Sequence, residues 1–131
     1  MTIKAIILPA LIAAIAVPAA AEAQQRRGWQ TIGTQKVAFG AETDTFPVRG
    51  NARHSMVRIC AMRRDVRLLD ADVRFANGGE QDILGGRRSV RAGTCTRAVD
   101  LRGNRRNIAS VKLAYSRFNR GVAPRISVQA R

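Results

Sequence analysis

Hydrophobic and polar residues alternate in short runs along most of this chain, a pattern typical of β-strands. No apolar stripe recurs every three and four residues over ten or more positions, so we expect no long helix. Gly, Asn and Asp, which accept turn conformations, separate the runs. We therefore predict eight or nine short strands, over residues 30–39, 43–48, 55–62, 66–76, 80–84, 89–92, 94–101, 107–117 and 125–130.

The alternation also predicts which side chains face a core, because neighbouring residues on a strand point to opposite faces. Pro47 has no backbone N–H to donate, so the strand at 43–48 should lie at a sheet edge or end there. Asn77-Gly78-Gly79 indicates a hairpin turn that would place Arg74 opposite Asp82. The expected core residues are Ile32, Val37, Phe39, Val57, Ile59, Ala61, Leu69, Ala71, Val73, Phe75, Val99, Leu101, Val111, Leu113, Tyr115, Ile126 and Val128, with Ile108 on the opposite face of its strand.

Strands at roughly ten-residue spacing indicate one antiparallel β-sandwich or small barrel. The domain should span residues 29–131, after a basic linker at 24–28. Residues 1–23 have a single early cation, an apolar run at 5–20 and a small-residue ending, the order of a secretory signal peptide. The run is shorter than a membrane span needs, so we expect a cleaved signal rather than an anchor, and a periplasmic or secreted bacterial protein.

Export changes how the two cysteines should be interpreted. In an oxidising compartment, Cys60 and Cys95 are expected to form a disulfide, between the sheets or between neighbouring strands. These cysteines and the single His54 lack the spacing of a zinc site, and we predict no metal and no cofactor. His54 is interpreted as an ordinary loop or strand-end residue.

The formal net charge of +14 favours a polyanionic partner, although an Arg-rich composition that only provides solubility is an equal alternative. Nucleic acid is the weakest option, because few aromatic residues are available to stack on bases. Three adjacent arginine pairs fall in predicted turns, and guanidinium groups bind phosphate, sulfate or carboxylate in two places at once. The candidate anion-binding residues are Arg63, Arg64, Arg87, Arg88, Arg91, Arg102, Arg105 and Arg106.

Four acids alternate on the two strands of the predicted hairpin. Asp70, Asp72, Glu80 and Asp82 could bind calcium or act as an acid/base pair. The stronger interpretation is a solvent face with cross-strand ion pairs, since arginines lie on the same hairpin.

The resemblance to known proteins rests on turn and core motifs of residues 57–128. These motifs are Asp72-Val73-Arg74-Phe75-Ala76-Asn77-Gly78, Gln81-Asp82, and Val99-Asp100-Leu101-x-Gly103-x-x-Arg106-x-Ile108-x-x-Val111-x-Leu113-x-Tyr115. In these motifs the chain resembles a family of small exported bacterial β-sandwich proteins with no assigned activity. The stretch 99–113 is more weakly similar to discoidin-type jelly rolls, which implies a jelly-roll-like sandwich and a structural role for Asp100 in holding the 102–106 loop.

Together these features predict an exported, non-enzymatic module that binds an anionic envelope or extracellular polymer, such as lipopolysaccharide, membrane head groups or acidic polysaccharide, through loop arginines. The alternatives are a periplasmic protein-interaction, inhibitor or accessory subunit, and a hydrolase that uses the four acids.

Overall fold

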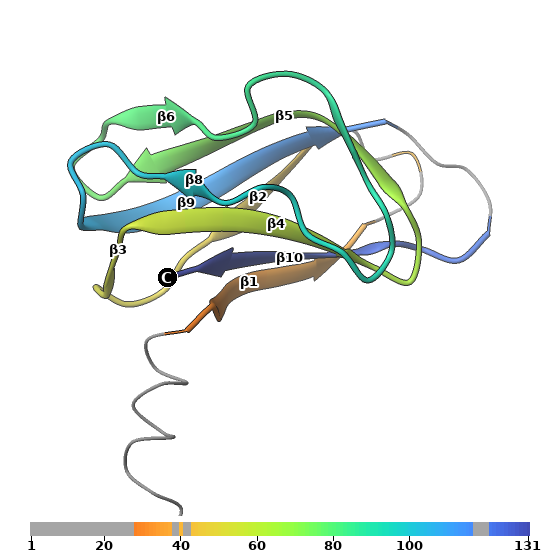
Figure 1. The fold of residues 1–131 in the computed structure, drawn as a ribbon, viewed down its shortest axis with the longest axis horizontal. Helices are drawn as coiled ribbons and strands as arrows, with labels where there is room; N and C mark the ends of the chain where they lie inside the picture. The colour runs from red at the N-terminus through yellow and green to blue at the C-terminus, as the bar shows by residue number, and fades with distance from the viewer. Residues whose placement is uncertain (1–27, 38–39, 41–42, 117–120) are drawn as a thin grey trace, which may run out of the picture.

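The computed structural model describes residues 28–37, 40, 43–116 and 121–131, which form ten strands in two antiparallel sheets (Figure 1). The first sheet has the order β1 (Gln30–Lys36), β10 (Arg125–Ala130), β4 (Met56–Met62) and β8 (Val99–Asp100). The second has the order β2 (Thr43–Pro47), β9 (Arg106–Tyr115), β5 (Val66–Phe75) and β6 (Glu80–Asp82). Two short strands extend it, β3 (Arg53–His54) beside β9 and β7 (Arg88–Val90) beside β5.

One hydrophobic core is shared by the two sheets. Val57 and Val128 of the first sheet and Val73 and Val111 of the second are fully buried in the same cluster. Burial of such side chains stabilises a fold by about 1.5–3 kcal/mol each relative to exposure. The all-β prediction is confirmed, and in the described ranges no helix has the length and hydropathy to cross a bilayer.

Most predicted strands are present, but several are shorter than expected. β2 lies at the edge of its sheet and ends at Pro47, as its missing N–H requires. The predicted strand at 94–101 is reduced to Val99–Asp100, with one isolated bridge between Cys95 and Cys60. Asp82 ends β6 because its Oδ1 accepts from the main-chain N–H groups of Leu84 and Gly85, which turns the chain away from the sheet.

The sequence predicted the wrong side chain to face the core at one place in β5 and at one place in β9. Both places lie at an irregularity in the β5–β9 pairing. The register shifts between Leu68 and Asp70, so Leu68 is buried and Leu69 is only half-buried. A second shift lets Ile108 enter the core, although alternation with Val111 placed it outside. An extra residue in one strand of a pair reverses which face later side chains occupy.

The predicted register of the β5–β6 hairpin is also wrong. The Phe75 N–H donates to the Gly79 oxygen, so the turn starts one residue earlier than expected. Arg74 therefore lies opposite Glu80, and Asp72 lies opposite Asp82. The predicted signal peptide at 1–23, residues 24–27 of the predicted linker and the predicted core contact of Phe39 lie outside the described residues.

Candidate anion-binding site

The candidate arginines lie toward two opposite ends of the paired sheets. Arg63 and Arg64 lie in the turn between β4 and β5. Arg87, Arg88 and Arg91 lie near that turn because β7 pairs with the start of β5 and the Ala92 N–H donates to Asp65. The loop between β8 and β9 carries the other three to the opposite end, where β3 lies (Figure 1). That loop supplies Arg102 and Arg105, and Arg106 is the first residue of β9 directly after it.

We call this second region the β3 end, formed by residues 28–32, 47–55, 75–80, 100–107 and 131. Main-chain hydrogen bonds join these distant segments: Ser55 N–H donates to the Arg131 oxygen, and Leu101 N–H donates to the Ser55 oxygen. Ala76 N–H likewise donates to the Asn107 oxygen. Side chains from five parts of the chain are therefore held at one end of the molecule.

Three hollows open at the β3 end, and they share wall residues. The largest has a volume of about 490 Å³ and is lined by Arg53, His54, Arg105 and Arg131, among others. A hollow of about 400 Å³ shares His54 with it and adds Arg49. A third, of about 250 Å³, shares Arg53 and Arg105. No Asp or Glu side chain is among the described residues that line these three hollows.

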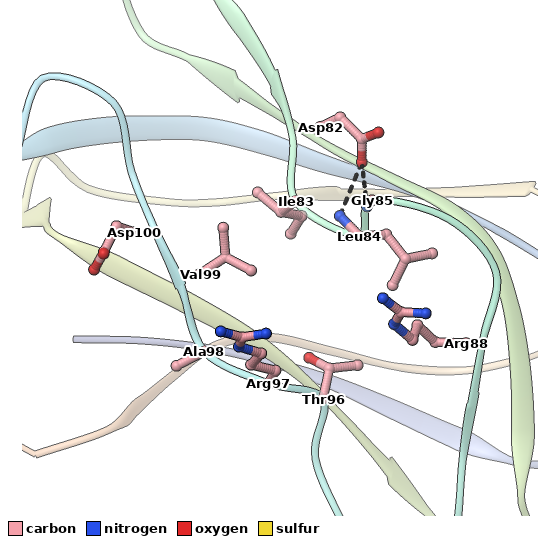
Figure 2. Close-up of a pocket in the computed structure, with 10 residues that line it drawn as sticks. All are labelled: Asp82, Ile83, Leu84, Gly85, Arg88, Thr96, Arg97, Ala98, Val99 and Asp100. Carbon is pink, nitrogen blue, oxygen red and sulfur yellow. Dashed lines mark hydrogen bonds between the residues drawn. The ribbon is translucent and has the colours of Figure 1, made fainter.

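A fourth hollow, on the side of the molecule, has balanced charge. It has a volume of about 380 Å³, and its wall includes Arg88 and Arg97 together with Asp82 and Asp100. Figure 2 shows these lining residues. A carboxylate near a guanidinium competes with any incoming anion, so this hollow is the poorer anion site. Asp82 is itself engaged, since the main-chain N–H groups of Leu84 and Gly85 donate to it at 2.8 and 3.2 Å.

Two of the predicted arginines at the β3 end hold the loop together. Arg106 donates from Nη1 to the Arg102 oxygen at 2.9 Å and from Nη2 to Oδ1 of Asn77 at 3.1 Å. Its guanidinium carbon lies 3.7 Å from the centroid of the Phe75 ring, a cation–π contact. Arg102 donates from Nη2 to the main-chain oxygen of Glu80 at 2.6 Å.

The expected role of Asp100 in this loop is replaced by a glutamine. The side chain of Gln81 donates to the Asp100 oxygen at 2.9 Å and accepts from the Arg102 N–H at 2.8 Å. Asp100 thus contributes its main-chain oxygen, whereas the sequence motif indicated its carboxylate.

Three other guanidinium groups at this end remain available to a ligand. The side chains of Arg49, Arg53 and Arg105 are exposed and donate no hydrogen bond to a described residue. Arg131 is exposed too, and its guanidinium carbon lies 6.0 Å from the centroid of the Trp29 ring. Sequence reasoning missed Arg49, Arg53 and Arg131, which are not in adjacent pairs; only the pairing of β3 with β9 brings Arg53 beside the Arg105 loop.

His54 lies at the centre of this region. Its side chain is only 6% exposed, and no described residue hydrogen-bonds to its imidazole, although it lines two of the hollows. Burial lowers the pKa of His54, and the positive charge of Arg105 lowers it further. The neutral imidazole is therefore favoured at pH 7. His54 is the last residue of β3, in keeping with the predicted loop or strand-end position.

The hairpin acids form a cluster on the outer face of the second sheet. Three carboxylate oxygens, one from each of Asp70, Asp72 and Asp82, lie within 4.8 Å of one another. Burial raises the pKa of Asp72, and the neighbouring carboxylates, Asp70 foremost, raise it further. Asp70 accepts from its neighbour's N–H, that of Ala71, at 2.9 Å. The cluster thus replaces the predicted Arg74–Asp82 pair with like charges opposite each other.

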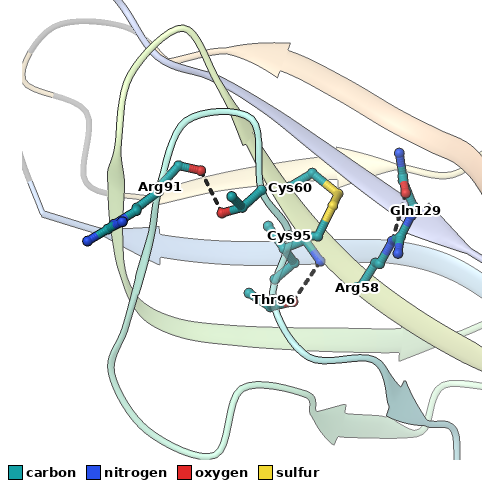
Figure 3. Close-up of a disulfide and its surroundings, with 8 residues drawn as sticks. Arg58, Cys60, Arg91, Cys95, Thr96 and Gln129 are labelled. Carbon is teal, nitrogen blue, oxygen red and sulfur yellow. Dashed lines mark hydrogen bonds between the residues drawn. A yellow bond between two sulfur atoms is a disulfide. The ribbon is translucent and has the colours of Figure 1, made fainter.

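The predicted disulfide is present. Cys60 of β4 is bonded to Cys95 in the segment beside it, so the bond links neighbours in one layer (Figure 3). Thr96 holds the same segment to β4, since its Oγ1 accepts from the Ile59 N–H at 2.9 Å. On the outer face nearby, Arg58 donates from Nε to Oε1 of Gln129 at 2.8 Å.

These observations define an all-β domain of two antiparallel sheets with a disulfide and a basic end whose three hollows are lined by no described Asp or Glu side chain. The chain belongs to the family described as Domain of unknown function (DUF2541), whose model matches residues 7–130. The predicted membership of a family without an assigned function is confirmed. No curated protein matches the chain.

One solved structure, described as "Structural and functional characterization of Pseudomonas aeruginosa AlgX", is similar at 10% identity and a TM-score of 0.42. The similarity covers 78% of this chain and 26% of that one, so the chain spans about a quarter of that protein's length.

Proposed function

We propose that this protein is an exported, non-enzymatic module that binds an anionic polymer, lipopolysaccharide or acidic polysaccharide, through the arginines of the β3 end. The observation that carries the proposal is the set of three adjoining hollows lined by arginines without a described carboxylate side chain. The unengaged guanidinium groups of Arg49, Arg53 and Arg105 would supply the contacts.

Binding of this kind draws on two physical effects. The net charge of +14 attracts a polyanion over distances of about one Debye length, roughly 8 Å at physiological salt. At contact, each guanidinium group can hold an oxyanion with two parallel hydrogen bonds, which adds geometric selectivity to simple attraction.

Export to an oxidising compartment is part of the proposal. It is supported by the signal-like order of residues 1–23 and by the Cys60–Cys95 disulfide, a bond that persists outside reducing compartments. The jelly-roll form of the sandwich is supported by the strand orders, in which β1-β10-β4-β8 stands against β2-β9-β5-β6 and successive strands change sheets repeatedly.

Binding to lipopolysaccharide and to polygalacturonate, measured by calorimetry over a salt series, tests the proposal. The variant Arg53→Gln/Arg105→Gln should lose at least about tenfold in affinity, since hydrogen bonds to charged groups contribute about 1.5–3 kcal/mol each. The control, Arg87→Gln/Arg91→Gln, removes the same charge from the other end of the sheets. It should lose no more than about threefold, because only long-range attraction changes.

Two results would contradict the proposal. If neither polymer binds at low ionic strength, the proposed function is wrong, because a charge-driven contact is strongest under that condition. Equal losses in the two double variants would show that net charge, and not the β3 end, carries binding.

A further inference from the structure

The wall between the two largest hollows of the β3 end contains one nearly buried polar group. His54 lines both hollows, is 6% exposed, and has no side-chain hydrogen-bond partner among the described residues. Its imidazole nitrogens are not among the buried polar atoms that lack a partner in the described residues, so the small exposed part of the ring leaves a nitrogen accessible from the hollows. A ligand oxygen entering a hollow could therefore form a hydrogen bond with this imidazole.

The number of donors around the larger hollow indicates what kind of anion fits. Arg53, Arg105 and Arg131 line it together with the imidazole. A carboxylate has two oxygens to accept from them, whereas a phosphate or sulfate ester has three non-bridging oxygens arranged around a tetrahedral centre. The tetrahedral group can meet donors that approach from several directions, which a planar carboxylate cannot.

We propose that the β3 end is a site for a tetrahedral oxyanion, a phosphate or sulfate group, and that the imidazole of His54 donates to it alongside Arg53, Arg105 and Arg131. The proposal rests on the polyanion-binding function above and specifies the group on the polymer that the site selects.

A consequence is that binding is coupled to a proton on His54. The charged groups around the imidazole are the arginines of its hollows, Arg49, Arg53, Arg105 and Arg131, and its cross-strand partner Arg106. Burial, and with it the positive charge of Arg105, lowers the pKa of His54 and so disfavours the imidazolium form in the free protein. A bound dianion reverses the local field, so the pKa of His54 rises and affinity increases as the pH falls.

His54 is the single histidine of the sequence, so its imidazole C–H signals in an NMR spectrum report on the site directly. Sodium sulfate, phosphate and acetate would be titrated into the wild-type protein at ionic strength matched with chloride. We expect saturable shifts with sulfate and phosphate, at least about tenfold weaker binding of acetate, and a raised His54 pKa at saturating sulfate. An imidazole signal that does not respond, or responds equally to acetate, would overturn the proposal.

Variants separate the imidazole from the arginines. Sulfate stays fully ionised between pH 5 and 8, so its affinity for the wild type should rise by about tenfold as the pH falls, which corresponds to one pKa unit. In His54→Gln, which keeps a donor but cannot gain a proton, this pH dependence should vanish. Arg105→Gln should weaken sulfate binding at every pH, and Arg91→Gln should not. A pH dependence that survives in His54→Gln would contradict the role of the imidazole.

Polymers identify the source of the group and separate the two proposals. Lipopolysaccharide carries phosphate, dextran sulfate carries sulfate esters, and polygalacturonate carries only carboxylates. Equal binding of all three with no change at His54 would leave the polymer-binding function standing and reject the tetrahedral site. If inorganic sulfate binds saturably but none of the three polymers binds, the polymer-binding function is rejected and the tetrahedral-oxyanion site is supported.

Discussion

The disulfide should stabilise the domain mainly by restricting its unfolded state. Cys60 and Cys95 are 35 residues apart, and closing a loop of this length lowers the entropy of the unfolded chain by an amount equivalent to about 3.8 kcal/mol at 25 °C. For a domain of about 100 residues, with an unfolding entropy near 2.1 cal/mol/K per residue, this corresponds to a decrease of about 18 °C in Tm on reduction.

This decrease in Tm requires that the native structure survives reduction. Four hydrogen bonds hold the segment 93–96 on β4 independently of the sulfurs: Gly93 N–H to the Ala61 oxygen, Ala61 N–H to the Thr94 oxygen, Thr96 N–H to the Ile59 oxygen, and Ile59 N–H to the Thr96 hydroxyl. Because the native contacts remain, the difference between oxidised and reduced protein should lie in the unfolded chain.

Thermal and urea unfolding of the oxidised protein, the reduced protein and a Cys60→Ala/Cys95→Ala variant measure the effect. The reduced wild type and the double variant should unfold at similar temperatures, and reductant should not change the Tm of the variant. A decrease of less than about 5 °C on full reduction, near 1 kcal/mol, would refute the loop-entropy reasoning.

Two further substitutions test local features of the fold. Gly103 has a φ of +86°, and a Cβ added to it would lie 3.0 Å from Cδ of Arg106. Gly103→Ala should therefore destabilise the domain by about 1–3 kcal/mol in urea unfolding. Gly79→Ala is the matched control, because its added Cβ makes only ordinary contacts, and it should change stability by less than about 1 kcal/mol. Equal effects of the two alanines would reject the strain argument. The raised pKa of Asp72 means that the folded state binds a proton more tightly than the unfolded state, so stability is lost as the pH rises from about 3.8 through the folded pKa. Asp72→Asn should therefore raise the Tm at pH 7, and the gain should disappear near pH 3; a loss of Tm at pH 7 would show that Asp70 and its neighbours do not repel Asp72.

Local alternation was sufficient to predict the all-β class and most strands, because each strand buries one face in the shared core. It failed at Leu69 and Ile108, where an irregularity in the pairing changes the face. Such an irregularity depends on how two strands 40 residues apart in sequence align, and nothing in either strand alone specifies it.

The candidate site divides in the same way. Adjacent arginines such as Arg105 and Arg106 were evident from sequence, but the structure gives them different tasks, since Arg106 packs on Phe75 and Arg105 does not. The partners of Arg105 at the hollow come from residues 53–54 and from residue 131, which the pairing of β3 with β9 and of β10 with β4 brings together. Sequence proximity indicates loop arginines, whereas the topology selects which of them share a wall.

The register of the β5–β6 hairpin decides where the acids lie relative to the arginines of the β3 end. Since the turn begins one residue early, Asp72 lies opposite Asp82 and close to Asp70, and these carboxylates gather on the outer face of β5 and β6. An arginine-rich composition that served solubility alone would intersperse acids among the arginines, as in the hollow lined by Arg88 and Asp82. The three hollows at the β3 end are lined by arginines and by no described Asp or Glu side chain, and the imidazole of His54 lines two of them. This arrangement favours a binding role for the charge in these hollows, because Arg49, Arg53 and Arg105 form no ion pair with a described residue.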